Sequence, residues 1–486
     1  MPVKSRPFRP GEVIIALRPE MLLHPLAFGY PAPALQLLAM LRNNFGAVVK
    51  TLWPVGVDVL APSPAPLPPG LPAYVSELAA AGPAMFVKEK LDGLEWLNHG
   101  ILTRSRLRLH ARVADPGRVE AALSQIRESP AVLYAEAVPL IVAPKFEATN
   151  FIGGIGGSGG RPMGMATFGG VQTSEEDRFS WHRKAMGRPK GWDQIVINSI
   201  AVLDSGFDGG HRALPYAAVN YGTTESQKDN YGHGTFICGT LVGRADVARS
   251  DEEPALPPGI FPSSRVWTMK VIVRKDGTDE LDAGRYSLAL NVIAEANTAG
   301  MWLESKVTRP PLGIQVVSLS IWSGEETWLT EKDDIAKLEA KNILVVASAG
   351  NGLLAEGTRS KVRHPAALPW CISVGAHGPK WKRWKNTNLS TPDTGRDPSV
   401  DIYAPGERII AALPENKNFL GQSFGGVLTG TSMATPFVAA CAAVLRAKDP
   451  LITRQSVINR LKGSAQFDAD LDLQWWPLYW ESDEQE

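Results

Sequence analysis

The sequence predicts an α/β domain, with a mostly parallel sheet flanked by helices, that follows a smaller α+β module. Apolar, β-branched runs that end in small polar turns predict buried strands of this sheet at residues 200–203 and 343–347. Continuous apolar runs predict buried helices at residues 236–242 and 437–445. A clean alternation of polar and apolar residues over 106–113 predicts a half-buried strand in the preceding module.

The composition is that of a globular protein with more than one domain. The chain has 486 residues, with 50 Lys and Arg against 50 Asp and Glu. This balanced charge argues against nucleic acid or an anionic membrane as the main partner, and no segment is long and apolar enough to span a bilayer. The basic start lacks the apolar core of a secretory signal, and the three cysteines form no metal-ligand or disulfide pattern. We therefore expect a cytoplasmic protein without a metal site.

The N-terminal part of the chain contains two strand–helix–strand patterns. The second helix has Asp115 as its candidate cap, Pro116 in its first turn, and Val119, Leu123 and Ile126 on one face. The two patterns fit a split βαβ, ferredoxin-like module interrupted by a Pro-rich insertion. The expected elements are strands at 11–17, 48–53, 106–113 and 132–136, a helix at 34–43, the Pro-rich stretch at 62–72 and two short helical patterns that end near 97.

Changes in composition divide the chain into four predicted parts. Residues 150–170 are rich in glycine, which is typical of a flexible linker. The predicted parts are the N-terminal module (1–145), the linker (146–178), the α/β domain (179–470) and an aromatic and acidic C-terminal tail (471–486).

The segment GTSMATP, residues 430–436, places Ser432 just before the expected helix at 437–445. Pro436 suits the first turn of a helix, because its fixed φ fits there and its missing N–H has no partner. A serine at a helix N-terminus lies beside free backbone N–H groups, at the positive end of the helix dipole. This environment suits a nucleophile whose reaction creates an oxyanion, although a serine that only caps the helix is commoner.

Two ionisable residues occur upstream. Asp204 follows a predicted buried strand, which would deliver its carboxylate to the edge of the sheet where ligands and chemistry gather in open α/β folds. His233 lies between Gly232 and Gly234 at the start of an apolar run. Glycines on both sides allow the backbone at His233 to approach another element closely.

Asn351 follows another predicted strand, in a turn of small residues. Its amide can donate a hydrogen bond without carrying a charge, which suits a developing oxyanion. Each of these residues has an ordinary explanation when it is considered alone, as a turn, cap or structural residue. Together, in the order Asp, His, Asn, Ser, they favour a catalytic arrangement.

These motifs resemble those of the subtilisin-like (subtilase) serine proteases. Asp204 stands in Asp-Ser-Gly, His233 in His-Gly-Thr, Asn351 in Ala-Gly-Asn and Ser432 in Gly-Thr-Ser-Met-Ala-Thr-Pro. The order Asp, His, Ser is the one known for subtilisin itself. The resemblance implies a serine endopeptidase with Asp204, His233 and Ser432 as its triad and Asn351 as the donor to the oxyanion.

The resemblance also implies a pocket for the residue before the scissile bond. Trp322, Glu325 and Glu326 follow the first wall of that pocket, and they either shape its preference or form a solvated loop with one packed aromatic. Substrates of the family bind as an added strand, so that backbone hydrogen bonds give affinity and pockets give preference. The expected substrate-binding residues are Ser318, Leu319, Ser320, Ala349 and Gly350.

The N-terminal module is similar to the propeptide that chaperones and inhibits many subtilases. We therefore expect a protein or peptide substrate, the chain's own N-terminal module as an intramolecular inhibitor, and neither nucleic acid nor membrane as a partner. Calcium binding is frequent in the family, but no run of ligands here has the spacing of a known calcium loop, so no cofactor is expected to be required.

Two alternatives concern processing and activity. The protein is expected to be made as a precursor that either processes itself or is activated by a partner. An exposed linker is the expected place of self-cleavage, and the alternative is a tether that is never cut. The alternative to an active protease is a catalytically silent regulatory or binding protein that retains the subtilase fold.

Overall fold

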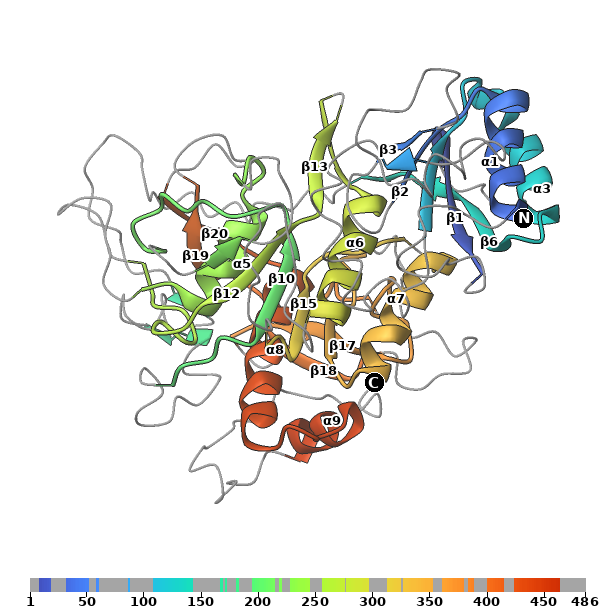
Figure 1. Cartoon of the computed structure of the whole chain (residues 1–486). Helices are drawn as coiled ribbons and strands as arrows, with labels where there is room; N and C mark the ends of the chain where they lie inside the picture. The colour runs from blue at the N-terminus through green and yellow to red at the C-terminus, as the bar shows by residue number, and fades with distance from the viewer. Residues whose placement is uncertain are drawn as a thin grey trace, which may run out of the picture. The chain divides into compact units, whose positions relative to one another are not determined.

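The chain forms two compact units in the computed structural model (Figure 1). The N-terminal unit comprises Met1–Ile141, Asp282–Leu312 and Trp328–Asp334, and the larger unit comprises Val142–Leu281, Gly313–Thr327 and Ile335–Glu486. The structure describes residues 8–18, 32–51, 58–60, 86–87, 108–142, 167–168, 171–172, 181–182, 195–214, 218–220, 228–244, 256–275, 277–296, 313–324, 327–352, 361–379, 383–388, 400–414 and 424–463.

The N-terminal unit contains an antiparallel sheet with the strand order β4-β3-β2-β5-β1-β6. Within it, the order β2-β5-β1-β6 is that of a split βαβ module, so the predicted α+β module is confirmed. The elements are β1 (Phe8–Leu17), α1 (Ala32–Phe45), β2 (Val48–Thr51), β3 (Asp58–Leu60), β4 (Phe86–Val87), β5 (Arg108–Arg112), η3 (Pro116–Arg118), α3 (Val119–Glu128) and β6 (Val132–Pro139). The short strand β7 (Ile141–Val142) follows where the N-terminal unit ends and the larger unit begins.

Helices α1 and α3 bury their apolar sides in one core with the sheet. Leu37 and Leu41 of α1 and Leu123 and Ile126 of α3 are nearly or fully buried in this core. The side chain of Asp115 accepts a hydrogen bond from the N–H of Gly117, so this residue caps the 3₁₀ turn η3 that leads into α3.

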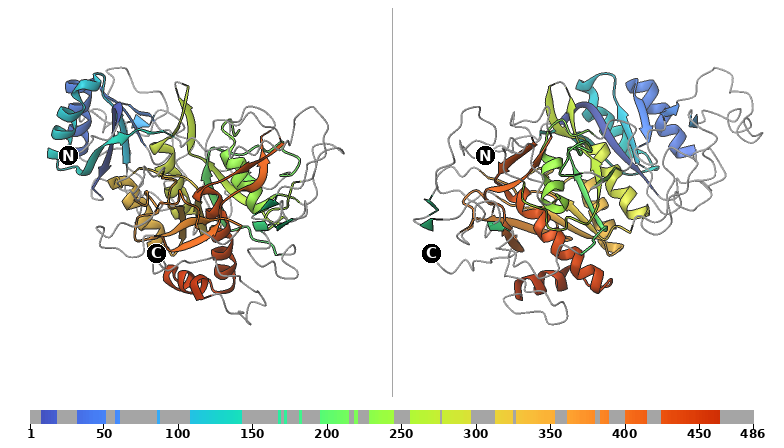
Figure 2. Two further views of the ribbon diagram at one scale, coloured as in Figure 1. Left: turned by 180° about the vertical axis from the view of Figure 1, so that it is seen from behind. Right: turned by 90° about the vertical axis from the view of Figure 1, so that its left-hand side faces the viewer.

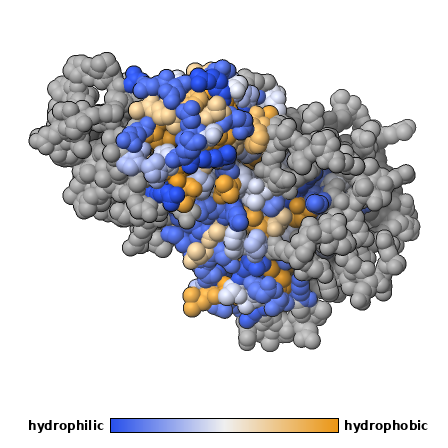
Figure 3. All heavy atoms as spheres, turned by 90° about the vertical axis from the view of Figure 1, so that its right-hand side faces the viewer, coloured by the Kyte–Doolittle hydropathy of each residue, from blue (hydrophilic) through white to orange (hydrophobic). Residues whose placement is uncertain are grey.

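On the face shown in Figure 3, hydrophilic residues predominate among the coloured atoms, with hydrophobic residues scattered between them.

Two polar side chains, one on β5 and one on β6, join the sheet of the N-terminal unit to later segments of the same unit. Arg108 on β5 donates hydrogen bonds to Asp334, to Asp333 at 2.6 Å and to Ser287 at 3.0 Å. Glu136 on β6 accepts hydrogen bonds from the N–H groups of Leu329 and Thr330, both at 2.8 Å. Ser287 belongs to α6 (Ala283–Ala296), and the other partners lie in the first turns of α7 (Leu329–Ala340).

The larger unit is built on a sheet in which every neighbouring pair of strands is parallel. Its strand order is β11-β12-β10-β15-β16-β17-β18, so the predicted mostly parallel sheet is confirmed. The strands are β10 (Ile200–Asp204), β11 (Ala218–Asn220), β12 (Val266–Lys270), β15 (Val316–Leu319), β16 (Leu344–Ser348), β17 (Cys371–His377) and β18 (Ile402–Pro405).

Helices α5 (His233–Val242) and α8 (Thr431–Lys448) pack against each other and against this sheet (Figure 2). Every residue of α5, and of α8 as far as Arg446, is buried. The remaining elements of the larger unit are the hairpins β8 (Thr167–Phe168) with β9 (Val171–Gln172), β13 (Ile272–Lys275) with β14 (Thr278–Leu281) and β19 (Ile409–Leu413) with β20 (Phe424–Leu428), and helix α9 (Arg454–Gly463).

The start of α8 corrects one expectation. The sequence pattern placed the first turn at Pro436, but α8 begins at Thr431 and contains Pro436 in its interior. Ser432 therefore lies in the first turn of the helix rather than before it. A proline inside a helix removes the hydrogen bond to the carbonyl four residues earlier, which here is the carbonyl of Ser432.

Some predicted parts lie outside the described residues. These are the C-terminal tail (471–486), the Pro-rich stretch at 62–72 and most of the predicted linker. Of the two short helical patterns that end near 97, the structure describes only residues 86–87, which form the strand β4 rather than a helix. In the part of the chain that the structure describes, none of the helices combines the length and hydropathy needed to cross a bilayer.

Candidate active site

Three functional segments lie at the carboxyl ends of neighbouring strands of the parallel sheet. Asp204 is the last residue of β10, Ser320 directly follows β15, and residues 349–351 directly follow β16. From β10 the sheet continues to β12 on one side and to β15 on the other, so the strand order reverses between β10 and β15. In open α/β sheets, ligands bind at such a point.

His233 is the first residue of α5 and contacts Asp204. Its imidazole Nδ1 lies 2.8 Å and 2.9 Å from the two carboxylate oxygens of Asp204. The side chains of His233 and Asp204 are 0% and 1% exposed. A Cβ atom at Gly234 would lie 2.2 Å from the carbonyl oxygen of Gly206, so only glycine allows the helix start to approach the loop after Asp204 this closely. A carboxylate on Nδ1 orients the ring and holds a proton on that nitrogen.

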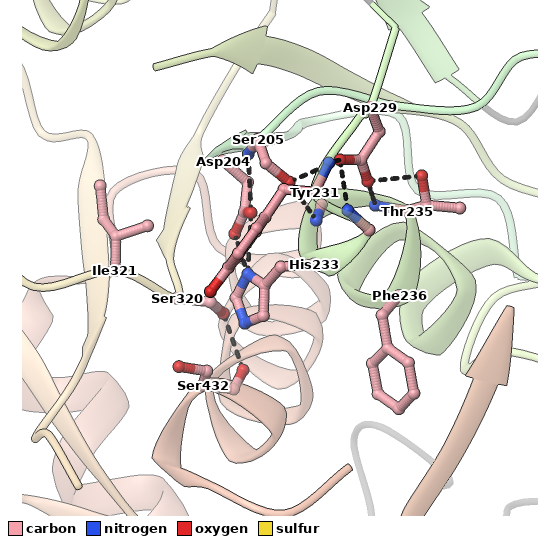
Figure 4. Close-up of polar contacts among 12 residues, drawn as sticks. Asp204, Ser205, Asp229, Tyr231, His233, Thr235, Phe236, Ser320, Ile321 and Ser432 are labelled. Atoms are coloured by element: carbon pink, nitrogen blue, oxygen red, sulfur yellow. Dashed lines mark hydrogen bonds and ion pairs between the residues drawn. The ribbon is translucent and has the colours of Figure 1, made fainter. Parts of the chain in front are cut away.

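Ser432 lies on the other side of the imidazole. In Figure 4 the ring of His233 is between the carboxyl group of Asp204 and Ser432. The main-chain carbonyl of Ser432 accepts a hydrogen bond of 2.7 Å from Oγ of Ser320. N–H groups in the first turn of a helix have no intrahelical partner and lie at the positive end of its dipole. This arrangement of carboxylate, imidazole and hydroxyl suits removal of the serine proton during nucleophilic attack.

Asn351 is held beside the first turn of α8. Its side-chain oxygen Oδ1 accepts hydrogen bonds from the N–H and the hydroxyl of Thr431, at 2.9 Å and 2.8 Å. Because these two bonds fix the amide oxygen, the orientation of the Nδ2 donor is fixed as well. The residue is exposed, so this donor is within reach of a ligand. A fixed amide donor next to a helix N-terminus can stabilise a negatively charged oxygen.

The residues expected to bind substrate flank this centre. Ser318 and Leu319 are strand residues of β15 with 0% exposure, and their side chains belong to the core of this structure. Ser320 is 1% exposed and contacts Ser432 as described. Ala349 is 0% exposed, and the N–H of Gly350 donates to the Thr431 hydroxyl at 3.1 Å.

Asp229 is a further residue of the site, and our reading of the sequence did not identify it. Its carboxylate is 0% exposed and accepts five hydrogen bonds. The donors are the hydroxyl of Ser205, the N–H groups of Tyr231, Gly232 and Thr235, and the hydroxyl of Thr235 (Figure 4).

Ser205 links Asp229 to Asp204, because its hydroxyl also accepts from the N–H of Gly234 at 2.8 Å and its own N–H donates to Asp204 at 2.7 Å. Asp229 thus joins the loop after Asp204 to the helix start that carries His233. One feature of the sequence could have identified Asp229: it is an acidic residue shortly before a predicted helix start. The carboxylate oxygens of such a residue can accept hydrogen bonds from the N–H groups of the first turn.

The two cysteines near the site are poor nucleophiles in this environment. Burial raises the pKa of Cys238, on the same helix as His233, and the nearby charges of Asp204 and Asp229 raise it further. Burial also raises the pKa of Cys441 on α8. Both thiols therefore stay protonated at neutral pH, and a protonated thiol neither attacks carbonyl groups well nor binds metal.

No metal centre accompanies these groups in the described residues. Nowhere in that part of the chain do three or more His, Cys, Asp or Glu side chains form a group that could hold a metal ion.

Comparison with known proteins identifies the family of the larger unit. The subtilase family (Peptidase_S8) matches residues 198–474. Subtilisin E of Bacillus subtilis (strain 168) is 30% identical over 309 residues, which cover 60% of this chain and 70% of subtilisin E. Subtilisin of Bacillus pumilus is 31% identical over 55% of this chain and 83% of its own length. The major intracellular serine protease of Bacillus subtilis (strain 168) is 28% identical over 54% of this chain and 73% of its own length.

The fold and these matches define a serine endopeptidase, a hydrolase of peptide bonds. The chain belongs to the subtilase family.

Proposed function

We propose that the chain hydrolyses peptide bonds through an acyl-enzyme on Ser432. In this mechanism His233 accepts the proton of the Ser432 hydroxyl as its oxygen attacks the peptide carbonyl. Asp204 keeps the imidazole in the required tautomer and stabilises its protonated form without taking the proton. The resulting oxyanion accepts hydrogen bonds from Nδ2 of Asn351 and from the N–H of Ser432.

The later steps use the same groups. His233 returns the proton to the leaving amine, which departs and leaves the acyl group on Ser432. A water molecule then gives a proton to His233 while its oxygen attacks the ester, and collapse of the second tetrahedral intermediate releases the carboxylic acid and restores the hydroxyl. The proposal is supported above all by the buried contact of 2.8 Å between His233 and Asp204, with Ser432 on the opposite side of the ring.

Covalent labelling tests the identity of the nucleophile. A fluorophosphonate reacts with activated serines, so we expect one adduct on the full chain, which peptide mapping assigns to Ser432. The Ser432→Ala variant should take up none, whereas Ser456→Ala, an exposed serine of α9, should label as the wild type does. Absence of any Ser432-dependent adduct, before and after proteolytic removal of the N-terminal module, would favour the catalytically silent alternative.

We also propose that the N-terminal module restrains the protease until it is cut or displaced. Support comes from the ion pairs of Arg108 with Asp333 and Asp334, because both aspartates lie on α7 in the family-matched region. Burial opposes the charge of Arg108, but Asp334, Tyr134 and Asp333 together outweigh this and hold the pKa of Arg108 above its usual value. Removing one partner from such a buried pair is strongly destabilising, on the order of 3–5 kcal/mol.

Intact mass measurements test the processing step. Purified protein on incubation should lose an N-terminal fragment through cleavage within residues 150–170, whereas the Ser432→Ala form should stay whole. Arg108→Ala should speed the appearance of activity, because the module is then held less firmly. Equal stability of the wild type and Ser432→Ala would show that the chain does not process itself.

Activity is proposed to need no metal. A chelator such as EDTA should leave peptidase activity and the thermal unfolding midpoint unchanged. If the chelator lowers the activity or the unfolding midpoint and added calcium restores it, the protein requires a metal.

A further inference from the structure

Arg363 is a cation that contacts the residues after β15 and β16, and the catalytic mechanism does not use it. Its N–H donates to the carbonyl of Ala349 at 2.9 Å, just after β16. The next residue, His364, pairs with the segment after β15: it donates to the carbonyl of Gly324 at 3.0 Å and accepts from the N–H of Ser323 at 2.7 Å. Arg363 therefore lies on a segment that is hydrogen-bonded both to the residues after β15 and to those after β16. The ends of these two strands flank the site.

The aliphatic part of Arg363 packs against Gly350. A Cβ atom on Gly350, whose φ is +105°, would lie 2.6 Å from Cγ of Arg363 and 2.5 Å from Nδ2 of Asn388. Gly350 in turn donates to the hydroxyl of Thr431, the residue before Ser432. The lack of a side chain at Gly350 thus lets both Arg363 and Asn388 come close to the start of α8.

The guanidinium of Arg363 lies over the ring of Trp322, 5.2 Å from its centroid. Trp322 comes two residues after Ser320, which contacts the carbonyl of Ser432. The segments after β15 and β16, which both contact the start of α8, therefore also contact Arg363. Burial lowers the pKa of Arg363 from its usual value, but guanidinium groups remain protonated at neutral pH.

Asn388 adds an unused hydrogen-bonding group on the same side of Gly350. The residue is 2% exposed, and its amide nitrogen and oxygen both lack a hydrogen-bond partner among the described residues. Buried amides are normally bonded, and an amide without a partner needs an explanation such as a ligand. A guanidinium with five N–H donors and a nearby amide N–H form a suitable set of donors for a carboxylate.

We propose that Arg363 selects substrates with an acidic side chain at the residue before the scissile bond, with Trp322 holding the guanidinium and Asn388 providing a second donor. The proposal rests on the proposed function, because it assigns the substrate class of the same site. A planar guanidinium binds a carboxylate through two parallel hydrogen bonds, whereas Lys or Arg in a substrate would meet a like charge. An apolar residue would desolvate the guanidinium without offering it a hydrogen-bond acceptor, which is costly.

Fluorogenic peptide amides that differ only in their last residue test this directly. Because Glu and Gln have nearly the same shape, the Glu/Gln ratio of kcat/KM isolates the charge. We expect the full-length wild type to favour Glu on the order of 10- to 100-fold, the range for hydrogen bonds to a charged group. Arg363→Gln should bring the ratio to about 1, and Arg363→Glu should favour Lys over Glu. Arg460→Gln, an exposed arginine on α9, should keep the wild-type ratio.

Fluorophosphonate labelling of each variant separates the possible failures. If Ser432 labels in the wild type but Gln peptides are cleaved as fast as Glu peptides, or if the ratio survives in Arg363→Gln, the assignment of Arg363 is wrong and the proposed function stands. If neither labelling nor cleavage of any peptide occurs in the wild type, the proposed function is wrong and the assignment of Arg363 falls with it. Loss of labelling in Arg363→Gln alone would mean that Arg363 supports the fold of the site rather than its selectivity.

Discussion

The hydroxyl of Ser320 donates a hydrogen bond of 2.7 Å to the main-chain carbonyl of Ser432. In a regular helix that carbonyl would accept from the N–H of residue 436, but residue 436 is a proline and has no N–H. Ser320, at the end of β15, supplies the missing donor. The bond therefore both satisfies a buried carbonyl and ties the helix that carries the proposed nucleophile to the sheet.

Ser320→Ala should destabilise the fold and slow catalysis. Leaving the buried carbonyl of Ser432 without its donor should lower the free energy of unfolding by about 1–3 kcal/mol, and looser positioning of Ser432 should lower kcat more than it changes KM. Ser318→Ala is the matched control: it is a buried serine two residues earlier whose hydroxyl has no hydrogen-bond partner among the described residues. Equal stability losses in the two variants, measured by urea unfolding in a Ser432→Ala background, would contradict this role.

Asp229→Asn should lower kcat and stability together. The amide keeps one acceptor oxygen but places an NH₂ group where the carboxylate now accepts from N–H and O–H donors, so several of the five hydrogen bonds are lost. The expected loss of unfolding free energy is on the order of 3 kcal/mol. Asp208→Asn, in the loop after Asp204, should lose less stability because, among the described residues, the side chain of Asp208 accepts only from Gly210, at 3.1 Å. Near-wild-type turnover in Asp229→Asn would show that Asp229 does not help to position His233.

The difference between Asp204 and Asp229 shows how far the sequence alone could lead. Asp204, His233, Asn351 and Ser432 lie in short motifs beside strand ends and helix starts, so local context was enough to propose them. The role of Asp229 depends on donors that its loop brings together, among them Ser205, 24 residues earlier. Such a contact becomes visible only when the fold is known.

The helix start at Thr431 shows a second limit of prediction from the sequence alone. The preference of proline for the first turn of a helix placed the start near Pro436. In the structure, the helix contains Pro436 in its interior. Ser320, which follows β15 and precedes the helix by more than 100 residues, donates to the carbonyl that the proline leaves without a hydrogen bond. A tertiary contact therefore overrode a local preference. In the N-terminal unit, by contrast, periodicity and helix-start signals predicted the split βαβ arrangement, because α1 and α3 bury their apolar sides against the sheet.

Asn351→Asp should separate the two functions of this side chain. The aspartate keeps the oxygen that accepts from the N–H and hydroxyl of Thr431 but lacks the Nδ2 donor and carries a negative charge. We expect kcat to fall on the order of a hundred- to a thousandfold, the magnitude known for loss of an oxyanion donor in subtilisin, a member of the same family. KM should change little, because the interaction forms in the transition state. A fall in kcat of less than fivefold at unchanged stability would exclude Asn351 as an oxyanion donor.

His377 should make the fold sensitive to acid. Burial lowers the pKa of this histidine from 6.5 to about 4. Between these values the unfolded chain binds a proton that the folded chain does not, so stability that is present above pH 6.5 is lost as the pH falls toward 4. The full difference corresponds to about 3 kcal/mol. Urea unfolding of Ser432→Ala at pH 7.5 and pH 4.5 should show most of this loss. Adding His377→Gln should remove the part of the pH-dependent loss of unfolding free energy that comes from His377. An identical pH dependence with and without His377 would contradict the assignment.

The central claim is that Ser432 carries the acyl group during peptide hydrolysis. The most direct measurement is the kcat/KM of the processed wild type, Ser432→Ala and Ser456→Ala on one fluorogenic peptide, with unfolding curves to confirm that all three are folded. We predict that Ser456→Ala retains wild-type activity and that Ser432→Ala loses on the order of a millionfold, the effect known for the nucleophile of subtilisin. Activity of Ser432→Ala within tenfold of the wild type would contradict the account.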